Sequence, residues 1–353
     1  MQPVAMTAER VKTIADIARL ANVSKATVSR ALNESPLVSA ETRERVRAIA
    51  RQHGFEMNAS ARSLSRREAN VVALATYPYE PFGPNKQPPG VAPAEKLPDT
   101  FVLEVMSGLV AGLHARDYDL LVIQIASDDT GWISRYLDAG RVDGFVLMAA
   151  SCTAKHLEAL EARAAPFVVW GLDSSSHAFS TVSGDSYAGG RMATRHLLEK
   201  GRRRIAFIGG PDGEQESQDR YRGYATALRG ADVDVDPSLV TYGWYSSESA
   251  TARMRDLLTR HDDIDGIFAC SDVMAIAAIE ELRGHGRRVP EDVSVVGYDD
   301  VSLAAHTDPP LTTVRQAGPL AGRLLADSLV QQLRTGAVGH VSIPAELVVR
   351  QST

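Results

Sequence analysis

The chain has few of the residues and segments that mark several protein classes. Its only cysteines, Cys152 and Cys270, lie far apart and inside apolar runs. This excludes a disulfide framework or a cysteine zinc site and indicates buried free thiols. The chain contains no run of about 18 apolar residues, the length that a membrane span needs. The N-terminal stretch MQPVAMTAERVKTIADIA lacks the apolar core of a secretory signal, and we therefore expect a cytoplasmic protein.

The chain is acidic overall, but its positive charge is concentrated near the start. The 353 residues carry a net charge of −6, yet residues 10–67 hold twelve Lys and Arg against five Asp and Glu. With 44% hydrophobic and 23% charged residues, the chain has the composition of a folded protein, and its length predicts two or three domains. A basic head on an acidic body is typical of a nucleic-acid-binding module joined to another domain. Charge alone also allows a solvated helical domain.

Three short helices are expected in the basic head. In the first, TIADIARLA, apolar residues recur at helical spacing, and Thr13 with Asp16 fits a capping box. The chain then turns at Asn22, a residue type that tolerates positive φ. Ser24 and Ser39 fit the N-caps of the second and third helices. Two short helices joined by such a turn form the pattern of a helix-turn-helix.

The outer face of the second helix, within ANVSKATVSRALN at residues 21–33, carries small and basic side chains. Val28 is predicted to face the first helix, which leaves Lys25, Ala26, Ser29 and Arg30 on the outside. Small residues let a helix approach the major groove, and Lys25 and Arg30 are long enough to reach bases or phosphates. The alternative is a three-helix bundle whose polar face only meets solvent.

The body, from residue 70 onward, alternates short apolar runs with helical patterns, which indicates parallel sheets covered by helices on both faces. The segments RVDGFVLMAAS and DIDGIFACSD repeat one pattern of Asp-Gly, apolar strand and polar end. Two similar halves of this kind fit a bilobal body with a ligand cleft between the lobes. The predicted strands are 71–76, 119–125, 144–149, 167–171, 204–210, 266–270 and 293–298, and the predicted helices include 102–116, 155–163, 186–200, 218–230, 248–260 and 273–285.

Polar and aromatic residues follow the predicted strand ends, where ligands of open α/β sheets bind. Carboxylates and a guanidinium can hydrogen-bond hydroxyl groups, and aromatic rings can stack on C–H faces, so the set suits a sugar. For each residue, the alternative to a role in ligand binding is that it caps a helix or is a charge on the surface. The candidates at strand ends are Tyr77, Asp173, Trp244, Tyr245, Ser271, Asp272, Asp299 and Asp300, and Arg220 opens the helix that contains RYRGY.

The segment TIADIARLANVSKATVSRALNESPLVSAETRERVRAIARQHGFEMNASARSL closely resembles the head and hinge of the LacI/GalR (lac repressor) family. The resemblance continues through RVDGFVLM, RRRIAFIGG, DRYRGYATAL, DGIFACSDVMAIAAIEEL, VPEDVSVVGYDD, PPLTTVRQ and ELVVRQST. It implies a helix-turn-helix DNA-binding head at 10–57 and a hinge helix with linker at 58–69. The body at 70–353 is then a periplasmic-binding-protein-like pair of parallel-sheet α/β subdomains that binds an effector and dimerises.

The resemblance also implies roles for individual residues. Lys25, Ala26 and Arg30 match base-reading positions, and Leu64 matches the hinge leucine that enters the minor groove and kinks the duplex. Leu64 packing on the body is the alternative. Residues at phosphate-contacting or phosphate-positioning sites are Thr13, Ser24, Thr27, Ser29, Asn33, Ser39 and Thr42, and those flanking Leu64 are Asn58, Ala61 and Arg62. Effector-contacting positions match Asp173, Arg220, Tyr245, Ser271 and Asp299, with Phe101 as a pocket aromatic.

The predicted function is that of a homodimeric transcriptional repressor. A small ligand, expected to be a sugar or sugar derivative, controls its affinity for a palindromic operator; purines are the alternative ligand class. No catalytic residue, metal or cofactor is expected. An uptake binding protein and an enzyme are the rival readings, but the basic head argues against the first. Adjacent acids such as Asp299 and Asp300 point in opposite directions, which argues against a glycosidase pair. The Pro-rich segment 77–100 is either a lid or a disordered insertion.

Overall fold

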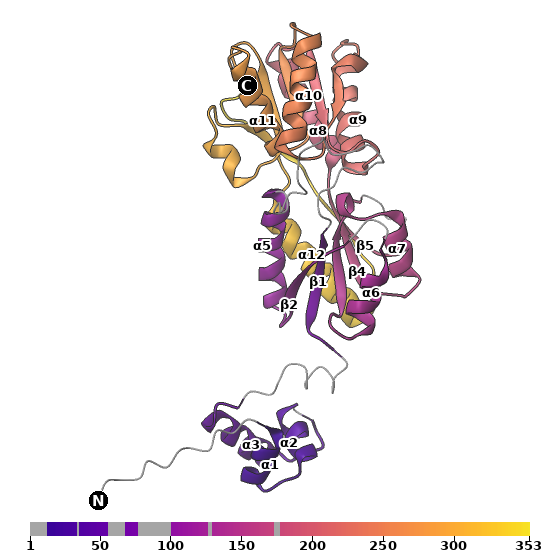
Figure 1. The fold of residues 1–353 in the computed structure, drawn as a ribbon, viewed down its shortest axis with the longest axis vertical. Coiled ribbons are helices and arrows are strands. Elements are labelled where there is room, and N and C mark those ends of the chain that lie inside the picture. Colours follow the sequence, from indigo (N-terminus) through magenta and orange to yellow (C-terminus); the bar gives the residue numbers. More distant parts are fainter. Residues whose placement is uncertain (1–12, 34, 56–67, 77–99, 126–128, 173–176) are drawn as a thin grey trace, which may run out of the picture. The chain divides into compact units, whose positions relative to one another are not determined.

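The computed structural model describes residues 13–33, 35–55, 68–76, 100–125, 129–172 and 177–353. The chain divides into two compact units, Met1–Ala69 and Asn70–Thr353, which we call the head and the body (Figure 1).

The head contains the three predicted helices, α1 (Ile14–Ala21), α2 (Lys25–Leu32) and α3 (Ala40–Gln52). Thr13 and Asp16 form the expected capping box, in which each side chain accepts a hydrogen bond from the other residue's backbone N–H. Asn22 adopts a left-handed conformation with φ of 49°, which lets the chain turn sharply between α1 and α2. The three helices enclose a small core of Ile17, Ala18, Ala21, Val28, Ala31, Val38, Val46 and Ala50.

The body contains two six-stranded sheets. The first, which together with its helices we call the N-lobe, has the strand order β11-β5-β4-β3-β1-β2. All its paired strands are parallel. Its elements are β1 (Val71–Thr76), α5 (Thr100–His114), β2 (Asp119–Gln124), α6 (Gly131–Ile133), the π-helical η1 (Ser134–Asp138), β3 (Gly144–Met148), η2 (Ala149–Ser151), α7 (Ala154–Glu161), β4 (Phe167–Trp170), β5 (Ser180–Gly184), α12 (Gly318–Thr335) and β11 (His340–Ile343).

The second sheet and its helices form the C-lobe, with the strand order β12-β10-β9-β8-β6-β7. Only the β10–β12 pair is antiparallel among its described pairings. Its elements are α8 (Ser186–Glu199), β6 (Ile205–Gly209), α9 (Gln215–Arg229), η3 (Pro237–Leu239), β7 (Val240–Tyr242), α10 (Ser247–Arg260), β8 (Gly266–Ala269), α11 (Asp272–Gly284), β9 (Ser294–Asp299), η4 (Ser302–His306), β10 (Thr312–Arg315) and β12 (Glu346–Val348).

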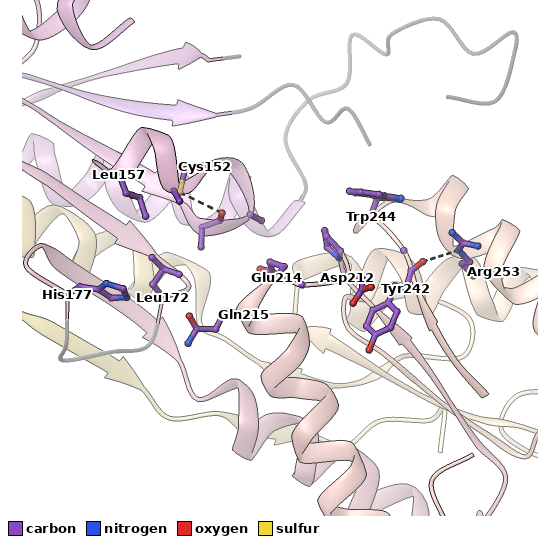
Figure 2. Close-up of a pocket in the computed structure, with 16 residues that line it drawn as sticks. Cys152, Leu157, Leu172, His177, Asp212, Glu214, Gln215, Tyr242, Trp244 and Arg253 are labelled. Atoms are coloured by element: carbon purple, nitrogen blue, oxygen red, sulfur yellow. Dashed lines mark hydrogen bonds between the residues drawn. The ribbon is translucent and has the colours of Figure 1, made fainter. Parts of the chain in front are cut away.

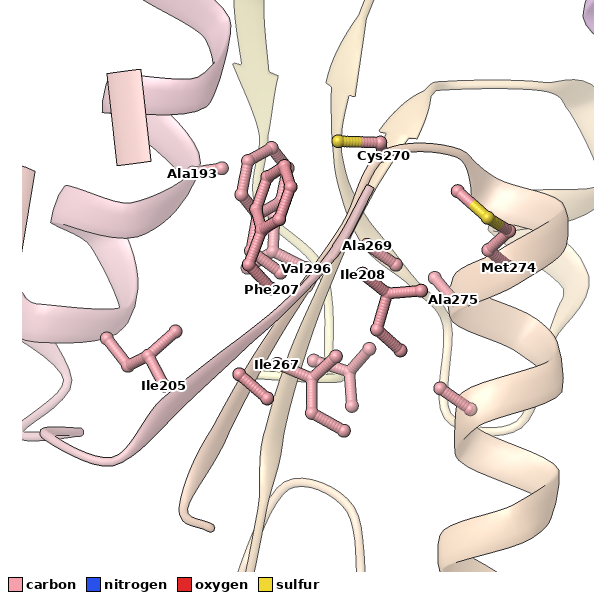
Figure 3. Close-up of a cluster of buried hydrophobic side chains, with 14 of the residues drawn as sticks. Ala193, Ile205, Phe207, Ile208, Ile267, Ala269, Cys270, Met274, Ala275 and Val296 are labelled. Atoms are coloured by element: carbon pink, nitrogen blue, oxygen red, sulfur yellow. The ribbon is translucent and has the colours of Figure 1, made fainter. Parts of the chain in front are cut away.

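Period-two alternation along the strands distributes apolar side chains to both faces of each sheet. In the N-lobe, Val72 and Leu74 pack toward α5 and α12, whereas Ala73 and Ala75 belong to the core on the opposite face. Figure 3 shows the same division in the C-lobe, where Phe207 lies on the side of α8 and its neighbour Ile208 lies on the side of α11. Helices therefore cover both faces, as the apolar strands predict.

The chain passes between the lobes three times: from β5 to α8, from β10 to α12, and from β11 to β12. All seven predicted strands are present, with ends shifted by at most one residue. Helix α12 and strands β5, β7, β11 and β12 are additional to the predicted elements. The expected fold class, a helix-turn-helix head with two parallel-sheet α/β subdomains, is confirmed.

The structure also bears on two other sequence-based expectations, which concern the cysteines and membrane-spanning segments. Cys270 is buried, but Cys152 is only half-buried, because it follows the short η2 turn at the edge of a cavity. Both thiols are free. Among the described helices, none combines the length and the apolar composition that a bilayer crossing requires.

Candidate DNA-binding and effector sites

The second helix of the head presents the predicted recognition surface. Lys25, Ala26 and Arg30 are exposed, whereas Val28 and Ala31 on the opposite face are buried against the rest of the head. This division places the long basic side chains and the small alanine on one free face of α2. The arrangement is that of a helix-turn-helix recognition helix.

Hydroxyl side chains occupy the starts of the three helices in the described part of the head. Thr13, Ser24 and Ser39 are the N-caps of α1, α2 and α3, and each accepts a hydrogen bond from a backbone N–H within the first turn. The hydroxyl groups of Ser24 and Thr27 lie 2.9 Å apart. Helix N-termini carry partial positive charge and favour phosphate groups, so these ends are suited to the DNA backbone.

Of the other predicted phosphate contacts, Ser29, Asn33 and Thr42 are half-buried. The hinge candidates Asn58, Ala61, Arg62 and Leu64 lie outside the described residues, and so do the effector candidates Tyr77 and Asp173.

A cavity of about 650 Å³ lies between the two lobes of the body (Figure 2). The N-lobe side is apolar apart from His177 and the Cys152 thiol, and the C-lobe side carries Asp212, Glu214, Trp244 and other polar residues. Trp244 is the only predicted effector residue among those that line the described part of the cavity. The full lining is Ala149, Ala150, Cys152, Ala154, Leu157, Leu172, His177, Pro211, Asp212, Gly213, Glu214, Gln215, Tyr242, Gly243, Trp244 and Arg253.

A buried polar cluster centred on Arg220 adjoins this cavity. The Arg220 guanidinium is 2% exposed, donates to the Cys270 carbonyl at 2.7 Å and to Glu216 Oε1 at 3.2 Å, and lies 3.9 Å from the centre of the Tyr298 ring. These contacts bring Arg220 beside Ser271 and Asp299, the residues that follow Cys270 and Tyr298. Three predicted effector residues therefore meet in one place.

Glu214 connects the buried cluster to the cavity. Its backbone belongs to the loop that lines the cavity, and its Oε2 accepts hydrogen bonds from the Tyr245 hydroxyl at 2.6 Å and the Ser217 N–H at 3.1 Å. Burial raises the pKa of Glu214 above its usual range, and burial together with the nearby Glu214 charge raises the pKa of Tyr245. Desolvation likewise raises the pKa of Glu216 to about 7, despite the nearby positive charge of Arg220.

The remaining effector candidates have internal partners. Asp299 Oδ1 accepts a hydrogen bond from Gln316 Nε2 at 2.6 Å, and the Ser271 hydroxyl caps α11 by accepting from the Met274 N–H at 3.2 Å. Phe101 is 6% exposed and packs against Trp170, with the ring centroids 5.5 Å apart.

Asp272, another effector candidate, also has internal partners. The sequence places it at a strand end and so suggests a ligand contact, but the structure buries it completely as the first residue of α11. Its Oδ1 accepts from the Thr313 hydroxyl at 2.5 Å and its Oδ2 accepts from the Val301 N–H at 2.9 Å. Burial raises the Asp272 pKa to about 7. Each of the two oxygens of Asp272 therefore accepts a hydrogen bond from within the protein.

Sequence reasoning missed Glu214 and Glu216. The same strand-end rule applied to the loop after β6, which reads GGPDGEQE, would have pointed to both acids.

The head and the body together define a class of protein, in which a helix-turn-helix is joined to a periplasmic-binding-protein-like domain. Comparison with known sequences agrees. The profile of "Bacterial regulatory proteins, lacI family" matches residues 13–58, and that of "Periplasmic binding protein-like domain" matches residues 194–353.

Full-length relatives extend this match. The chain is 36% identical over 347 residues to the HTH-type transcriptional regulator CelR of Thermobifida fusca, covering 98% of this chain and 97% of that one. It is 31% identical over 347 residues to the ribose operon repressor of Haemophilus influenzae, covering 96% and 98%. The chain therefore belongs to the LacI family of bacterial regulatory proteins, and it is a DNA-binding transcriptional regulator.

Solved structures show the same fold. A structure of a CelR–cellobiose complex superimposes with a TM-score of 0.71 at 34% identity, covering 97% of this chain and 99% of that one. The lac repressor dimer bound to operator and the anti-inducer ONPF gives a TM-score of 0.79 at 25% identity, covering 97% and 98%.

Proposed function

We propose that this protein is a homodimeric repressor whose affinity for a palindromic operator is controlled by a sugar or sugar derivative bound between the lobes. The observation that carries the proposal is the presence, in one chain, of an exposed basic recognition face on α2 and an interlobe cavity next to a buried polar cluster. The α2 face can recognise DNA, and the interlobe cavity is a place where a small ligand can contact both lobes.

For the DNA, we assign base reading to Lys25, Ala26 and Arg30. The helix starts at Thr13, Ser24 and Ser39 position the head on phosphates, because an N-terminal helix end attracts an anion. Thr27, Ser29, Asn33 and Thr42 complete the phosphate set, and Leu64 with Asn58, Ala61 and Arg62 is proposed to occupy the minor groove.

For the effector, the chemistry of the site favours a ligand rich in hydroxyl groups. Asp212, Glu214 and Gln215 line the C-lobe wall, and Trp244 offers an aromatic surface. Within the described ranges no hydrogen-bond partner reaches Glu214 Oε1 or Arg220 Nε, so the buried cluster keeps unused capacity for polar groups. The CelR structure cited above contains cellobiose. We propose that Phe101, Arg220, Trp244, Tyr245, Ser271 and Asp299, with Tyr77 and Asp173, form the effector site or its supporting layer.

For the dimer, we propose the face formed by α5 and the neighbouring edge strand β2. Leu103 and Val110 on α5 and Val122 on β2 are 38%, 49% and 44% exposed, which is unusual for large apolar side chains in one region. A second copy of the chain would cover them, and the similar lac repressor structure is a dimer.

We also propose that the protein binds and releases its ligand without any chemical reaction on it. Asp299 hydrogen-bonds to Gln316, whereas Asp300 pairs with Arg315 and Arg350, so the two acids face different partners and do not flank a common bond. An operator-binding protein acts where the chromosome is, and we therefore place it in the cytoplasm.

The test has two stages. A thermal-shift screen of sugars, sugar phosphates and purines identifies the ligand, and selection from random duplexes identifies the operator. Operator affinity is then measured with and without the ligand. A change of about 5- to 150-fold, with the ligand recovered intact, supports the proposal. Unchanged operator affinity, or conversion of the ligand, would overturn it.

A further inference from the structure

Three consecutive residues that follow β9, Asp300, Val301 and Ser302, contact both lobes, and we call them the bridging segment. We infer that Glu104, on the N-lobe helix α5, is a positioning residue that holds this segment and thereby favours one orientation of the two lobes over others. The consequence for regulation rests on the proposed function, whereas the control of lobe orientation does not.

The bridging segment is anchored firmly in the C-lobe. The Val301 N–H donates to the buried Asp272 carboxylate at 2.9 Å. The Asp300 carboxylate accepts from Arg315 Nε at 2.7 Å and from Arg350 Nη2 at 2.6 Å. With both residues fixed, the segment moves with the C-lobe.

The same segment is also held by the N-lobe. The Val301 side chain is 2% exposed and belongs to the N-lobe core that includes Phe101 and Val105 of α5. One residue further along, the N–H and the hydroxyl group of Ser302 both donate to Glu104 Oε1, each at 2.9 Å. Glu104 therefore provides a charged, doubly hydrogen-bonded link between the lobes.

Glu104 also lies beside the first turn of α12. A Cβ atom on Gly318, the first residue of α12, would lie 3.4 Å from Glu104 Oε2, so the carboxylate lies beside the N-terminal end of that helix. The α12 N-cap, Ala317, supplies no side-chain hydrogen bond. A carboxylate at such a helix end is stabilised by the partial positive charge there. Because Gly318 follows the crossover from β10, Glu104 contacts both the bridging segment and an interlobe crossover.

The link is suited to bias the lobes without locking them. Ser302 is exposed and Glu104 is half-buried, so solvent weakens their interaction. The bridging segment also begins directly after Asp299, which hydrogen-bonds to Gln316 in the same crossover. A ligand that contacted Asp299 would thus act one residue away from the segment that Glu104 holds.

The lobe-orientation test uses the full-length protein without ligand or DNA. Amide hydrogen exchange at Ser302 should become about five- to tenfold faster in Glu104→Ala, which removes the acceptor. It should stay close to the wild-type rate in Glu104→Gln, which keeps an acceptor oxygen, and in Glu161→Ala, which truncates an exposed glutamate on α7.

Spin labels report lobe orientation directly. Placed at Glu158→Cys on α7 and Arg229→Cys on α9, in a Cys152→Ser background, they should give a shifted or broadened distance distribution in Glu104→Ala and a restored one in Glu104→Gln. A thermal midpoint close to wild type in Glu104→Ala would separate this effect from general destabilisation. Wild-type exchange at Ser302 together with an unchanged distribution would overturn the inference.

The regulatory consequence has its own measurement. Once a ligand and an operator are identified, the factor by which the ligand changes operator affinity should differ from wild type by about fivefold in Glu104→Ala and by much less in Glu104→Gln. An unchanged factor would overturn the regulatory part. Failure of every duplex to bind would instead refute the proposed function. The exchange and spin-label measurements would still test the control of lobe orientation by Glu104.

Discussion

The carboxylate of Glu216, on α9 of the C-lobe, lies directly against Gly171, which follows β4 of the N-lobe. A Cβ atom at Gly171 would come within 2.5 Å of Glu216 Oε2. Gly171 has a φ of +89°, and Glu216 is 8% exposed. The close approach of the two lobes at this point thus depends on the absence of a side chain at residue 171.

Gly171→Ala should disfavour this arrangement of the lobes. The new methyl group would collide with the Glu216 carboxylate, and relief requires the lobes to separate or Glu216 to lose its contact with Arg220. Inserting volume into a packed region costs about 1–3 kcal/mol, and because this cost falls on the arrangement in which the lobes meet beside the cavity, we expect ligand affinity to fall by up to that amount. Calorimetry with the ligand found by screening would measure it.

Gly201→Ala is the matched control. Gly201 has a similar φ of +85° but no atom within 4 Å of its Cβ position, so it reproduces the backbone strain without the collision. Equal ligand affinity in the two variants would show that strain alone, and not the Gly171–Glu216 contact, explains any loss.

Stability should depend on pH through Glu216. Its pKa is about 7 in the folded protein, against the usual glutamate value of 4.5. Between these values the unfolded chain releases the proton while the folded protein keeps it, so the contribution of this group to stability is full below about pH 4.5 and declines as the pH rises through 7. Thermal midpoints of wild type and Glu216→Gln, measured from pH 5 to 8, should differ by an amount that changes with pH. Parallel curves would contradict the assignment.

Arg220 should matter for both folding and binding. Above about pH 7, where Glu216 is ionised, Arg220→Ala leaves this buried carboxylate without its ion pair, and breaking such a pair costs about 3–5 kcal/mol of stability. Arg220→Lys keeps the charge and isolates the loss of the planar guanidinium, and we expect it to weaken ligand binding by about 1–3 kcal/mol. Arg222→Ala is the control, because that side chain is 66% exposed and pairs only with Asp219 among its described ion pairs. Wild-type ligand affinity in Arg220→Lys would move the site away from this cluster.

Arg30 should contribute to the recognition of a specific base in the operator. Arg30→Ala is expected to cost about 1–3 kcal/mol on the cognate operator and much less on random duplex DNA, because a base contact is lost only where the right base is present. Arg51→Ala removes another exposed arginine of the head, one that pairs with Glu44 on α3 instead of lying on α2. Fluorescence anisotropy on both duplexes distinguishes the two variants. Equal losses on cognate and random DNA would make Arg30 a phosphate contact.

The sequence predicts those parts of the fold that depend on local signals. The Thr13–Asp16 capping box and the left-handed Asn22 need only neighbouring residues, and strands such as Val71–Thr76 are continuous apolar runs. By contrast, β5 reads STVSG, and its pairing partners are β4 and β11, the second of which begins at His340. Because β5 is stabilised mainly by residues far along the chain, its own sequence does not show the apolar pattern by which a strand is recognised.

The candidate site shows a similar limit. Strand-end reasoning places Ser271 and Asp299 in one region, because parallel strands end at one edge of the sheet, and Arg220 of α9 joins them through Cys270 and Tyr298. It does not give the direction of a side chain that begins a helix. Asp272 turns into the C-lobe to meet Val301 and Thr313, and only the three-dimensional packing of α11, β9 and β10 determines that.

Helices α5 and α12 pack so closely that a Cβ atom on Gly108 would overlap the backbone of Pro319, and one on Gly322 would overlap the backbone of Val105. The two helices lie more than 200 residues apart in the sequence, and β11 at the edge of the same sheet is later still. During synthesis, the N-lobe therefore cannot bury the apolar face of α5 until the ribosome has made almost the whole chain. The C-lobe segment from α8 to β9 is contiguous and can collapse first, so nascent chains should present a partly open N-lobe to chaperones until α12 emerges.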